Sequence, residues 1–272
     1  MESEAINADG LLRSRIETRR RTQSFSDDYS VQKTNDDATE CKYAAQQMGY
    51  FTDNFVRRFV IAKETIGHRD PEILRGYWAR VVAIKSIVDT FLMRVGVSCQ
   101  IINLGAGFDT LYWRLKSEGK QFKKFVDVDF SSVTSKKIRM IMKPGEPNLL
   151  SFFSKKPEES HHEDLHAGDY QLLGADLRQS KELKEKLESA GLDFDIPTIF
   201  IAECVLVYMS VDKSRELLSN IPNWFRTAVF INYEQVCISD SFGSIMLANL
   251  LRRGIVLPGI PDCENLEAQS RR

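Results

Sequence analysis

The feature that most constrains the fold of this chain is a series of short apolar runs separated by helix-like stretches. The runs are Cys99–Asn103, Phe125–Asp129, Tyr170–Gly174, Thr198–Ala202 and Ala228–Tyr233. Helix-like segments such as Lys181–Ala190 and Lys213–Trp224 lie between them. Strands that alternate with helices predict a parallel sheet with helices on both faces. We therefore expect an α/β, Rossmann-like fold, with the Pro-, Ser- and Glu-rich segment Lys143–His166 as a long surface excursion.

The N-terminal third of the sequence divides into a tail and two helices. Residues 1–38 are polar, with a basic cluster at Arg19–Arg21 and little apolar periodicity, which predicts a disordered tail. We interpret the cluster as solvated, with a nuclear signal or docking patch as the alternative. Apolar residues recur at helical spacing from residue 40 to Gly67 and again over Pro71–Val95. These helices, within residues 40–95, are expected to form an N-terminal cap on a single domain of residues 39–272.

Charge and composition exclude several classes of partner. The 37 basic and 38 acidic residues nearly cancel, so no global field favours nucleic acid or an anionic membrane. The longest apolar stretch, Thr198–Met209, contains Glu203 and is shorter than the roughly 20 residues of a membrane span. Five cysteines without a CxxC pair argue against disulfides and zinc. We expect a cytoplasmic protein with no metal site, no nucleic-acid partner and no membrane partner, and with His161 and His162 on a surface loop.

The turn after the first apolar run carries the sharpest motif. Asn103–Thr110 reads Asn-Leu-Gly-Ala-Gly-Phe-Asp-Thr, and its glycines, Gly105 and Gly107, permit a tight turn and close approach to a ligand. Such a turn can also arise for steric reasons alone. However, Asp129 ends the next strand 22 positions beyond Gly107, where nucleotide-binding folds place a carboxylate that accepts from ribose hydroxyls. The alternative is an acid that merely ends a strand, and Asp127 shows how readily that occurs.

Two further acidic residues follow later strands. Asp176 can accept from an adenine amino group while Leu177 frames the ring, although a helix N-cap is an equally good explanation of Asp176. Glu203 lies within an apolar run. An unpaired carboxylate there would be costly, so Glu203 requires a partner or a ligand.

The glycine turn also discriminates between nucleotides. A dinucleotide pyrophosphate prefers the full Gly-x-Gly-x-x-Gly turn, but Thr110 occupies the third glycine position here. Asp109 would place a negative charge near the diphosphate of a dinucleotide and repel it, whereas a positively charged sulfonium tolerates a nearby carboxylate. S-adenosylmethionine is therefore favoured over NAD.

Several blocks of this sequence resemble the leucine carboxyl methyltransferase family, from about residue 39 to the C-terminus. The most specific are Ala202–Met209 and Phe230–Gln235. The others are Cys41-Lys42 with Met48–Tyr50, Arg75–Arg80, Asn103–Thr110 with Trp113-Arg114, Val128–Phe130 and Gly174–Arg178.

The resemblance implies a class I methyltransferase sheet, S-adenosyl-L-methionine as cofactor, and a methyl ester as product. The acceptor would be the C-terminal leucine α-carboxylate of type 2A protein phosphatase catalytic subunits. Lys42 and Arg80 would pair with the carboxylate of the methionine moiety, Asp129 with the ribose and Asp176 with adenine. The implied cofactor-binding set, with Gly107 added from the glycine turn, is Lys42, Arg80, Gly105, Gly107, Asp129, Asp176, Leu177 and Glu203.

A carboxylate acceptor is already ionised near neutral pH, so transfer requires alignment more than a general base. We therefore expect no catalytic histidine. Arg178, Tyr208 and Tyr233 each adjoin a strand end and are candidates for orienting the acceptor carboxylate, with ordinary packing as the alternative for Tyr208.

The sequence departs from the family pattern near its C-terminus. Family members continue with two strands that form an antiparallel hairpin, but no strand is expected here after Tyr233. We expect that hairpin to be missing from a C-terminally shortened chain, leaving an exposed sheet edge. Two alternative functions remain: a non-catalytic form that binds cofactor or phosphatase, and a relative of the tRNA wybutosine-pathway methyltransferase, which generally carries an additional repeat domain.

Overall fold

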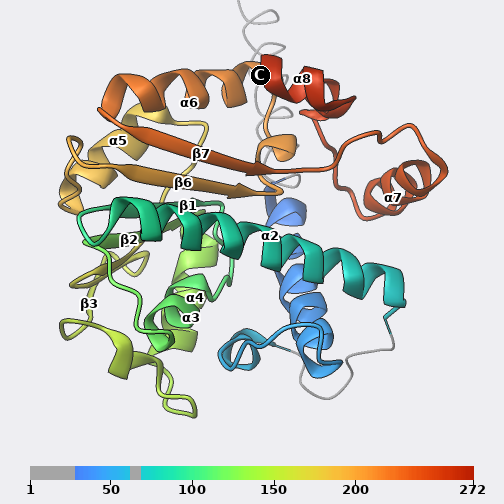
Figure 1. Cartoon of the computed structure of the whole chain (residues 1–272). Coiled ribbons are helices and arrows are strands. Elements are labelled where there is room, and N and C mark those ends of the chain that lie inside the picture. The colour runs from blue at the N-terminus through green and yellow to red at the C-terminus, as the bar shows by residue number, and fades with distance from the viewer. Residues whose placement is uncertain (1–27, 62–68) are drawn as a thin grey trace, which may run out of the picture.

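The computed structural model describes residues 28–61 and 69–272, which are arranged around a seven-stranded sheet (Figure 1). Five strands run parallel, in the order β5-β2-β1-β6-β7. They are β1 (Gln100–Leu104), β2 (Lys124–Asp129), β5 (Tyr170–Gly174), β6 (Thr198–Glu203) and β7 (Ala228–Tyr233). Each coincides with one of the five apolar runs, so the predicted α/β, Rossmann-like sheet is confirmed.

Two short antiparallel strands extend the sheet beyond β5. They are β3 (Glu158–Ser160) and β4 (Asp164–Ala167), and they follow the short helix η2 (Leu149–Phe152). β3 and residues 164–166 of β4 belong to the segment predicted as a surface excursion. The exposed edge strand β3 fits that prediction, whereas the buried β4 contradicts it. Only Leu165 and Ala167 of β4 are apolar, and both are fully buried. Two apolar residues are too few to produce a recognisable period, which is why the sequence does not reveal this strand.

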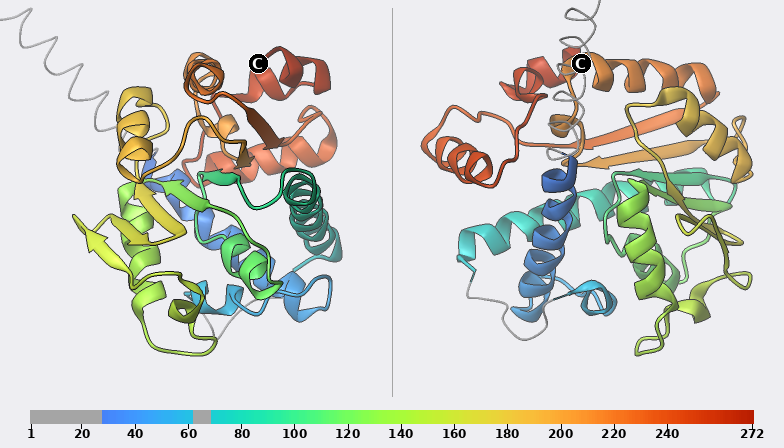
Figure 2. Two further views of the ribbon diagram at one scale, coloured as in Figure 1. Left: turned by 60° about the vertical axis from the view of Figure 1, so that its left-hand side comes forward. Right: turned by 180° about the vertical axis from the view of Figure 1, so that it is seen from behind.

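Helices cover both faces of the sheet (Figures 1 and 2). On one face, Ile101 and Phe125 belong to a buried cluster shared with α2 (Pro71–Val95), α3 (Leu111–Ser117) and α4 (Ser131–Met142). On the other face, Ile102 and Val126 pack with α5 (Ser180–Ser189) and α6 (Val211–Trp224). Neighbouring strand residues thus enter opposite cores, as expected for parallel strands buried on both sides.

The structure corrects the expected boundary of the N-terminal tail. Residues 28–47 form a helix, here called the N-terminal helix, so residues 28–38 are ordered; residues 1–27, with the Arg19–Arg21 cluster, lie outside the described residues. The first half of the helix was missed because tertiary contacts, many of them polar, stabilise it in place of an apolar stripe; its second half agrees with the helix expected from residue 40. It ends at residue 47 and is followed by η1 (Val56–Phe59), and the expected helix stop at Gly67 also lies outside the described residues.

The segment after β7 contains no strand, as predicted. Residues 234–272 form α7 (Ser241–Arg252), η4 (Ile260–Cys263) and α8 (Leu266–Arg271). β7 is therefore an edge strand, and its residues Ala228 and Val229 are exposed. The segment is anchored by Glu234, whose buried carboxylate accepts from Val207 N and from Arg272 Nη1, each at 2.6 Å. Across the described ranges, no helix is both long and apolar enough for a membrane span.

Candidate functional site

A cavity of about 480 Å³ lies where the carboxyl ends of the parallel strands meet the N-terminal helix. This edge of an open α/β sheet is where ligands bind. Every predicted site residue except Tyr233 lines the cavity: Lys42, Arg80, Gly105, Gly107, Asp129, Asp176, Leu177, Arg178, Glu203 and Tyr208. The predicted residues thus share one cavity, while Tyr233, the last residue of β7, is not part of its wall.

The glycine turn after β1 requires both of its glycines. Gly105 and Gly107 have φ values of +60° and +50°, the left-handed region that side chains disfavour. A Cβ at Gly105 would collide with the side chain of Val205, and one at Gly107 with Asn35 Oδ1. The turn is therefore closely covered both by the loop after β6 and by the N-terminal helix.

Asp129 is joined to the glycine turn by hydrogen bonds. Its Oδ2 accepts from Gly107 N and its Oδ1 from Phe130 N, each at 2.7 Å. Burial raises the pKa of Asp129 to about 6, and the two backbone amides oppose that rise. Each carboxylate oxygen has a second lone pair, so Asp129 retains acceptor capacity for a ligand.

Four charged side chains form a compact cluster in the cavity wall. Lys42 Nζ lies 2.9 Å from Asp109 Oδ2 and 2.8 Å from Glu203 Oε1, and Arg80 Nε also pairs with Glu203. The sequence-based requirement that Glu203 has a partner is therefore met. Burial alone would raise the pKa of Glu203, but Arg80 and Lys42 hold it below its ordinary value. Two cations and two anions balance, so the cluster has no net charge when all four are ionised.

A second buried network lies beneath the glycine turn. Lys137 of α4 has no exposed side-chain surface, and its Nζ donates to Asp127 Oδ2 at 2.8 Å and to the Asp109 carbonyl at 3.0 Å. Asp127 also accepts from Tyr170 Oη at 2.8 Å and from Asn103 Nδ2 at 3.1 Å. Asp127 is thus the structural partner of Lys137. Sequence reasoning missed Lys137 because nothing distinguishes it from the neighbouring Lys136.

Arg178 links the turn after β5 to the N-terminal helix. Its guanidinium donates to both carboxylate oxygens of Asp176 at 2.8–3.0 Å, and to both oxygens of Asp28 at 2.8 and 2.9 Å. Asp176 does not occupy the N-cap position of α5, which is Gln179. Its carboxylate instead accepts from the Arg178 amide and side chain.

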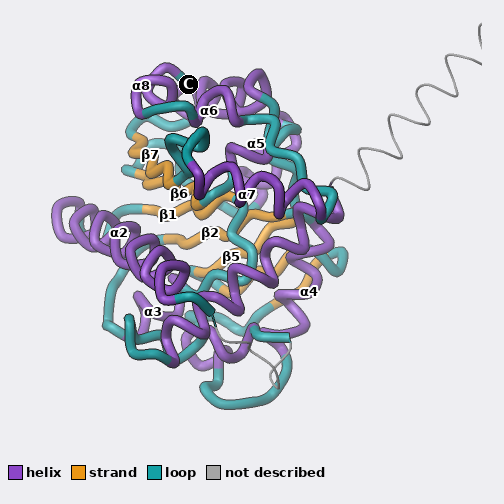
Figure 3. Tube along the Cα trace, turned by 90° about the vertical axis from the view of Figure 1, so that its right-hand side faces the viewer, coloured by secondary structure: helices purple, strands orange, loops and turns teal. Residues whose placement is uncertain are grey.

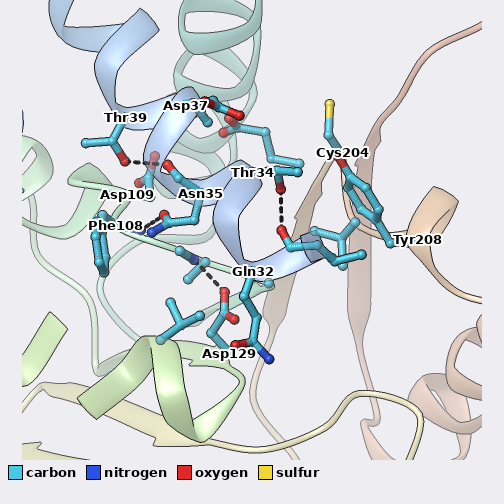
Figure 4. A pocket seen from close by; sticks show the side chains of 18 of the residues that line it. Gln32, Thr34, Asn35, Asp37, Thr39, Phe108, Asp109, Asp129, Cys204 and Tyr208 are labelled. Atoms are coloured by element: carbon cyan, nitrogen blue, oxygen red, sulfur yellow. Dashed lines mark hydrogen bonds between the residues drawn. The ribbon is translucent and has the colours of Figure 1, made fainter. Parts of the chain in front are cut away.

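The N-terminal helix contributes cavity residues that sequence reasoning missed. Asn35 Oδ1 accepts from Phe108 N at 2.7 Å, which fixes the helix to the glycine turn. Figure 4 shows Asn35 and Thr34 between Phe108 on one side and Tyr208 on the other. Tyr208 ends the short helix η3 (Leu206–Tyr208), and burial raises the pKa of its hydroxyl. Residues 28–38 of the helix could not be assigned to the site because this part of the sequence was interpreted as a polar tail.

The histidines and metal-binding groups lie as follows. His161 and His162 are exposed in the turn between β3 and β4, as predicted. Among residues 28–61 and 69–272, no group of three or more His, Cys, Asp or Glu side chains is arranged to hold a metal ion.

Comparison with known proteins identifies the family. The sequence profile described as leucine carboxyl methyltransferase matches residues 30–222. The chain belongs to the leucine carboxyl methyltransferase family. It is 53% identical to leucine carboxyl methyltransferase 1 of Caenorhabditis elegans, over the whole of this chain and 83% of that protein. The rat protein of the same name is 40% identical over 90% of this chain and 74% of its own length.

This chain also matches a relative that has a different name. The human tRNA wybutosine-synthesizing protein 4 is 35% identical over 89% of this chain, but the match covers only 36% of that protein. Among solved structures, a Thermobifida fusca protein described as a methyltransferase superposes with a TM-score of 0.50 and 16% identity, covering 69% of this chain and 63% of that one. That similarity concerns the fold alone, and it agrees with the predicted class I methyltransferase sheet.

Proposed function

We propose that this chain transfers a methyl group from S-adenosylmethionine to the C-terminal leucine α-carboxylate of a type 2A protein phosphatase catalytic subunit. The observation that carries the proposal is the convergence of Gly105, Asp129 and Glu203 on one cavity, in a member of the leucine carboxyl methyltransferase family. The partner would be the C-terminal tail of the phosphatase, and a cytoplasmic location stays a prediction.

The cavity residues fit this cofactor better than a dinucleotide. A volume of about 480 Å³ lies within the usual range for small-molecule sites. The charges of Asp109 and Glu203 are balanced by Lys42 and Arg80. Asp129 also lines the cavity and forms no ion pair with the described residues, so its carboxylate would repel a diphosphate. The same carboxylate favours a cation such as a sulfonium. The spare acceptor capacity of Asp129 suits ribose hydroxyls.

Different residues of this chain would bind different parts of the cofactor. When bound, S-adenosylmethionine supplies an electrophilic methyl group on a positively charged sulfur. Asp129 would accept from the ribose hydroxyls, and Asp176 with Leu177 would hold the adenine. Lys42 and Arg80 would face the carboxylate of the methionine moiety, while Glu203 keeps both cations in place.

The acceptor end of the reaction requires little proton transfer. A C-terminal carboxylate is ionised near neutral pH, so this chain needs to orient an oxygen and exclude water. The Tyr208 hydroxyl is protonated near neutral pH, and burial raises its pKa further, so it can donate a hydrogen bond to that carboxylate. Arg178 is held by Asp176 and Asp28, so we assign it to fixing the N-terminal helix over the cofactor.

Methyl incorporation tests the proposal directly. The purified chain is mixed with radiolabelled S-adenosylmethionine and a phosphatase catalytic subunit that either has or lacks its terminal leucine. Label that is released by mild alkali, as a methyl ester is, should appear only on the intact subunit. Asp129→Ala serves as the cofactor-binding control. Equal labelling of both subunits would contradict the proposal.

Two other outcomes correspond to the alternative functions. Binding of S-adenosylmethionine in a calorimeter without transfer to any acceptor would support a non-catalytic binding form. Label recovered in tRNA would instead support the function named for the wybutosine-synthesizing relative, which matches this chain over 89% of its length.

A further inference from the structure

One face of α7 lines the same cavity as the predicted cofactor residues. Phe242, Met246, Leu250 and Arg253 are all wall residues. They are spaced by four, four and three positions, which places them on one side of a helix. Three of the four are apolar, so this face, here called the α7 stripe, differs from the charged cluster around Glu203.

Several apolar side chains of α7 are largely exposed. Phe242 is 51% exposed, Ile245 64% and Leu251 68%, and Gly243 is its only buried residue. Exposed apolar surface of this extent beside a cavity is typical of a binding surface. The function described above does not use it.

The α7 stripe is nevertheless held firmly in place. Met246 and Leu250 pack on a small buried cluster that includes Val207 and Ile238, and Tyr208 packs on the same cluster. Asp240 caps the helix by accepting from Gly243 N at 2.6 Å. A Cβ at Gly243 would collide with the Ile238 backbone, so the helix is in close contact with this loop. The stripe and Tyr208 are therefore fixed relative to each other.

The order of the strands separates the α7 stripe from the cofactor residues. Along the carboxyl edge, the turn after β5 carries Asp176, β2 ends at Asp129, the turn after β1 carries Gly105, and β6 ends at Glu203. Figure 3 views this edge, with α7 on the side of β6 and β7. The adenine would lie at Asp176 and the ribose at Asp129. The methionine moiety would lie between Gly105 and Glu203. The stripe lies beyond them and presents no polar side chain until Arg253.

We propose that Phe242, Met246 and Leu250 form the subsite for the aliphatic side chain of the acceptor's C-terminal residue. The inference rests on the proposed function, because it assigns that acceptor to the part of the cavity next to Tyr208. The stripe contains no acidic residue that would repel a C-terminal carboxylate. Its far end is closed by the ion pair of Arg253 with Asp37 of the N-terminal helix. A leucine side chain is the size of group that three apolar residues can enclose.

Acceptor specificity is the measurement that tests this subsite. The full chain and its variants are assayed with phosphatase catalytic subunits ending in leucine, alanine or phenylalanine. Met246→Ala enlarges the subsite, so we expect kcat/KM for the leucine acceptor to fall by about tenfold or more. The phenylalanine acceptor should lose less, so the ratio of leucine to phenylalanine should fall. Phe242→Ala should change that ratio in the same direction.

The controls separate a specificity role from damage to the fold. Ile245→Ala is the matched variant, because Ile245 is exposed on α7 but is not a cavity-wall residue, and it should leave both acceptors unchanged. Affinity for S-adenosylhomocysteine, measured by calorimetry, should be the same in all three variants. An unchanged acceptor ratio in Met246→Ala and Phe242→Ala, or an equal effect of Ile245→Ala, would overturn the subsite alone. Absence of transfer to every acceptor by the wild-type chain would overturn the proposed function and the subsite together.

Discussion

Asp129 Oδ2 accepts a 2.7 Å hydrogen bond from the backbone amide of Gly107, so the acidic strand end and the glycine turn are one connected unit. The two residues follow neighbouring parallel strands, in which Leu104 is paired with Val128. That pairing explains why a carboxylate 22 residues after Gly107 could be expected to lie beside the glycine turn. The carboxylate that we propose as the ribose acceptor also fixes the turn that the ligand would approach.

We expect the affinity for S-adenosylhomocysteine to decrease as the pH is lowered through about 6. Burial raises the pKa of Asp129 to about 6, and its ionised form accepts stronger hydrogen bonds from ribose hydroxyls than its protonated form does. The contribution of Asp129 to the stability of the fold changes with pH in the opposite direction to the affinity. Because the folded pKa exceeds the ordinary value of 3.8, the stabilisation is complete below that value and is lost as the pH rises through about 6.

Calorimetry across this pH range checks the prediction, with Asp129→Asn as the control. The variant should bind at least about tenfold more weakly at neutral pH, because each charge-assisted hydrogen bond contributes about 1.5–3 kcal/mol. It should also show little pH dependence. A wild-type affinity that stays constant through pH 6 would remove Asp129 from the ribose-binding role.

Lys137→Met should destabilise the protein by about 3–5 kcal/mol. The substitution leaves the Asp127 carboxylate buried without its cation. Adding Asp127→Asn removes the unpaired charge, so the double variant should recover part of the loss in a urea titration. It should still bind S-adenosylhomocysteine more weakly, because the Asp109 carbonyl has lost its donor. A double variant no more stable than Lys137→Met would contradict this account.

Glu203→Gln should lower the free energy of unfolding, because Arg80 then has no carboxylate partner among the described residues and Lys42 keeps only Asp109. A double-mutant cycle with Lys42→Met measures the interaction between the two side chains. We expect a coupling energy of about 1–3 kcal/mol, as for groups in one ion-pair network. Additive effects of the two substitutions would show that the pair is energetically unimportant.

Asn35→Ala should speed the dissociation of S-adenosylhomocysteine. The substitution leaves the Phe108 amide without its acceptor and loosens the N-terminal helix over the cavity, at a cost of about 1–3 kcal/mol. Gln47→Ala is the control, because Gln47 is exposed on the same helix and bonds only to its neighbour Gln46 among the described residues. Equal dissociation rates for the two variants in stopped-flow fluorescence would argue against a covering role for Asn35.

The parallel strands and the residues predicted to surround the cavity follow from local patterns in the sequence. Apolar runs such as Thr198–Ala202 indicate buried strands locally, and the carboxyl ends of parallel strands must meet at one edge. Asp129, Asp176 and Glu203 could therefore be placed together without coordinates. The need of Glu203 for a partner also followed from its apolar surroundings alone.

How this edge of the sheet is covered depends on long-range contacts that the sequence does not reveal. Residues 28–38 of the N-terminal helix and the roles of Lys137 and the α7 stripe have no local signal, because they depend on contacts with residues far away in sequence. Asn35 meets Phe108, Arg253 meets Asp37, and each pair joins segments that local periodicity cannot relate. A hydrophobic period records which face of an element is buried, but it does not record which polar group will lie opposite once the chain has folded.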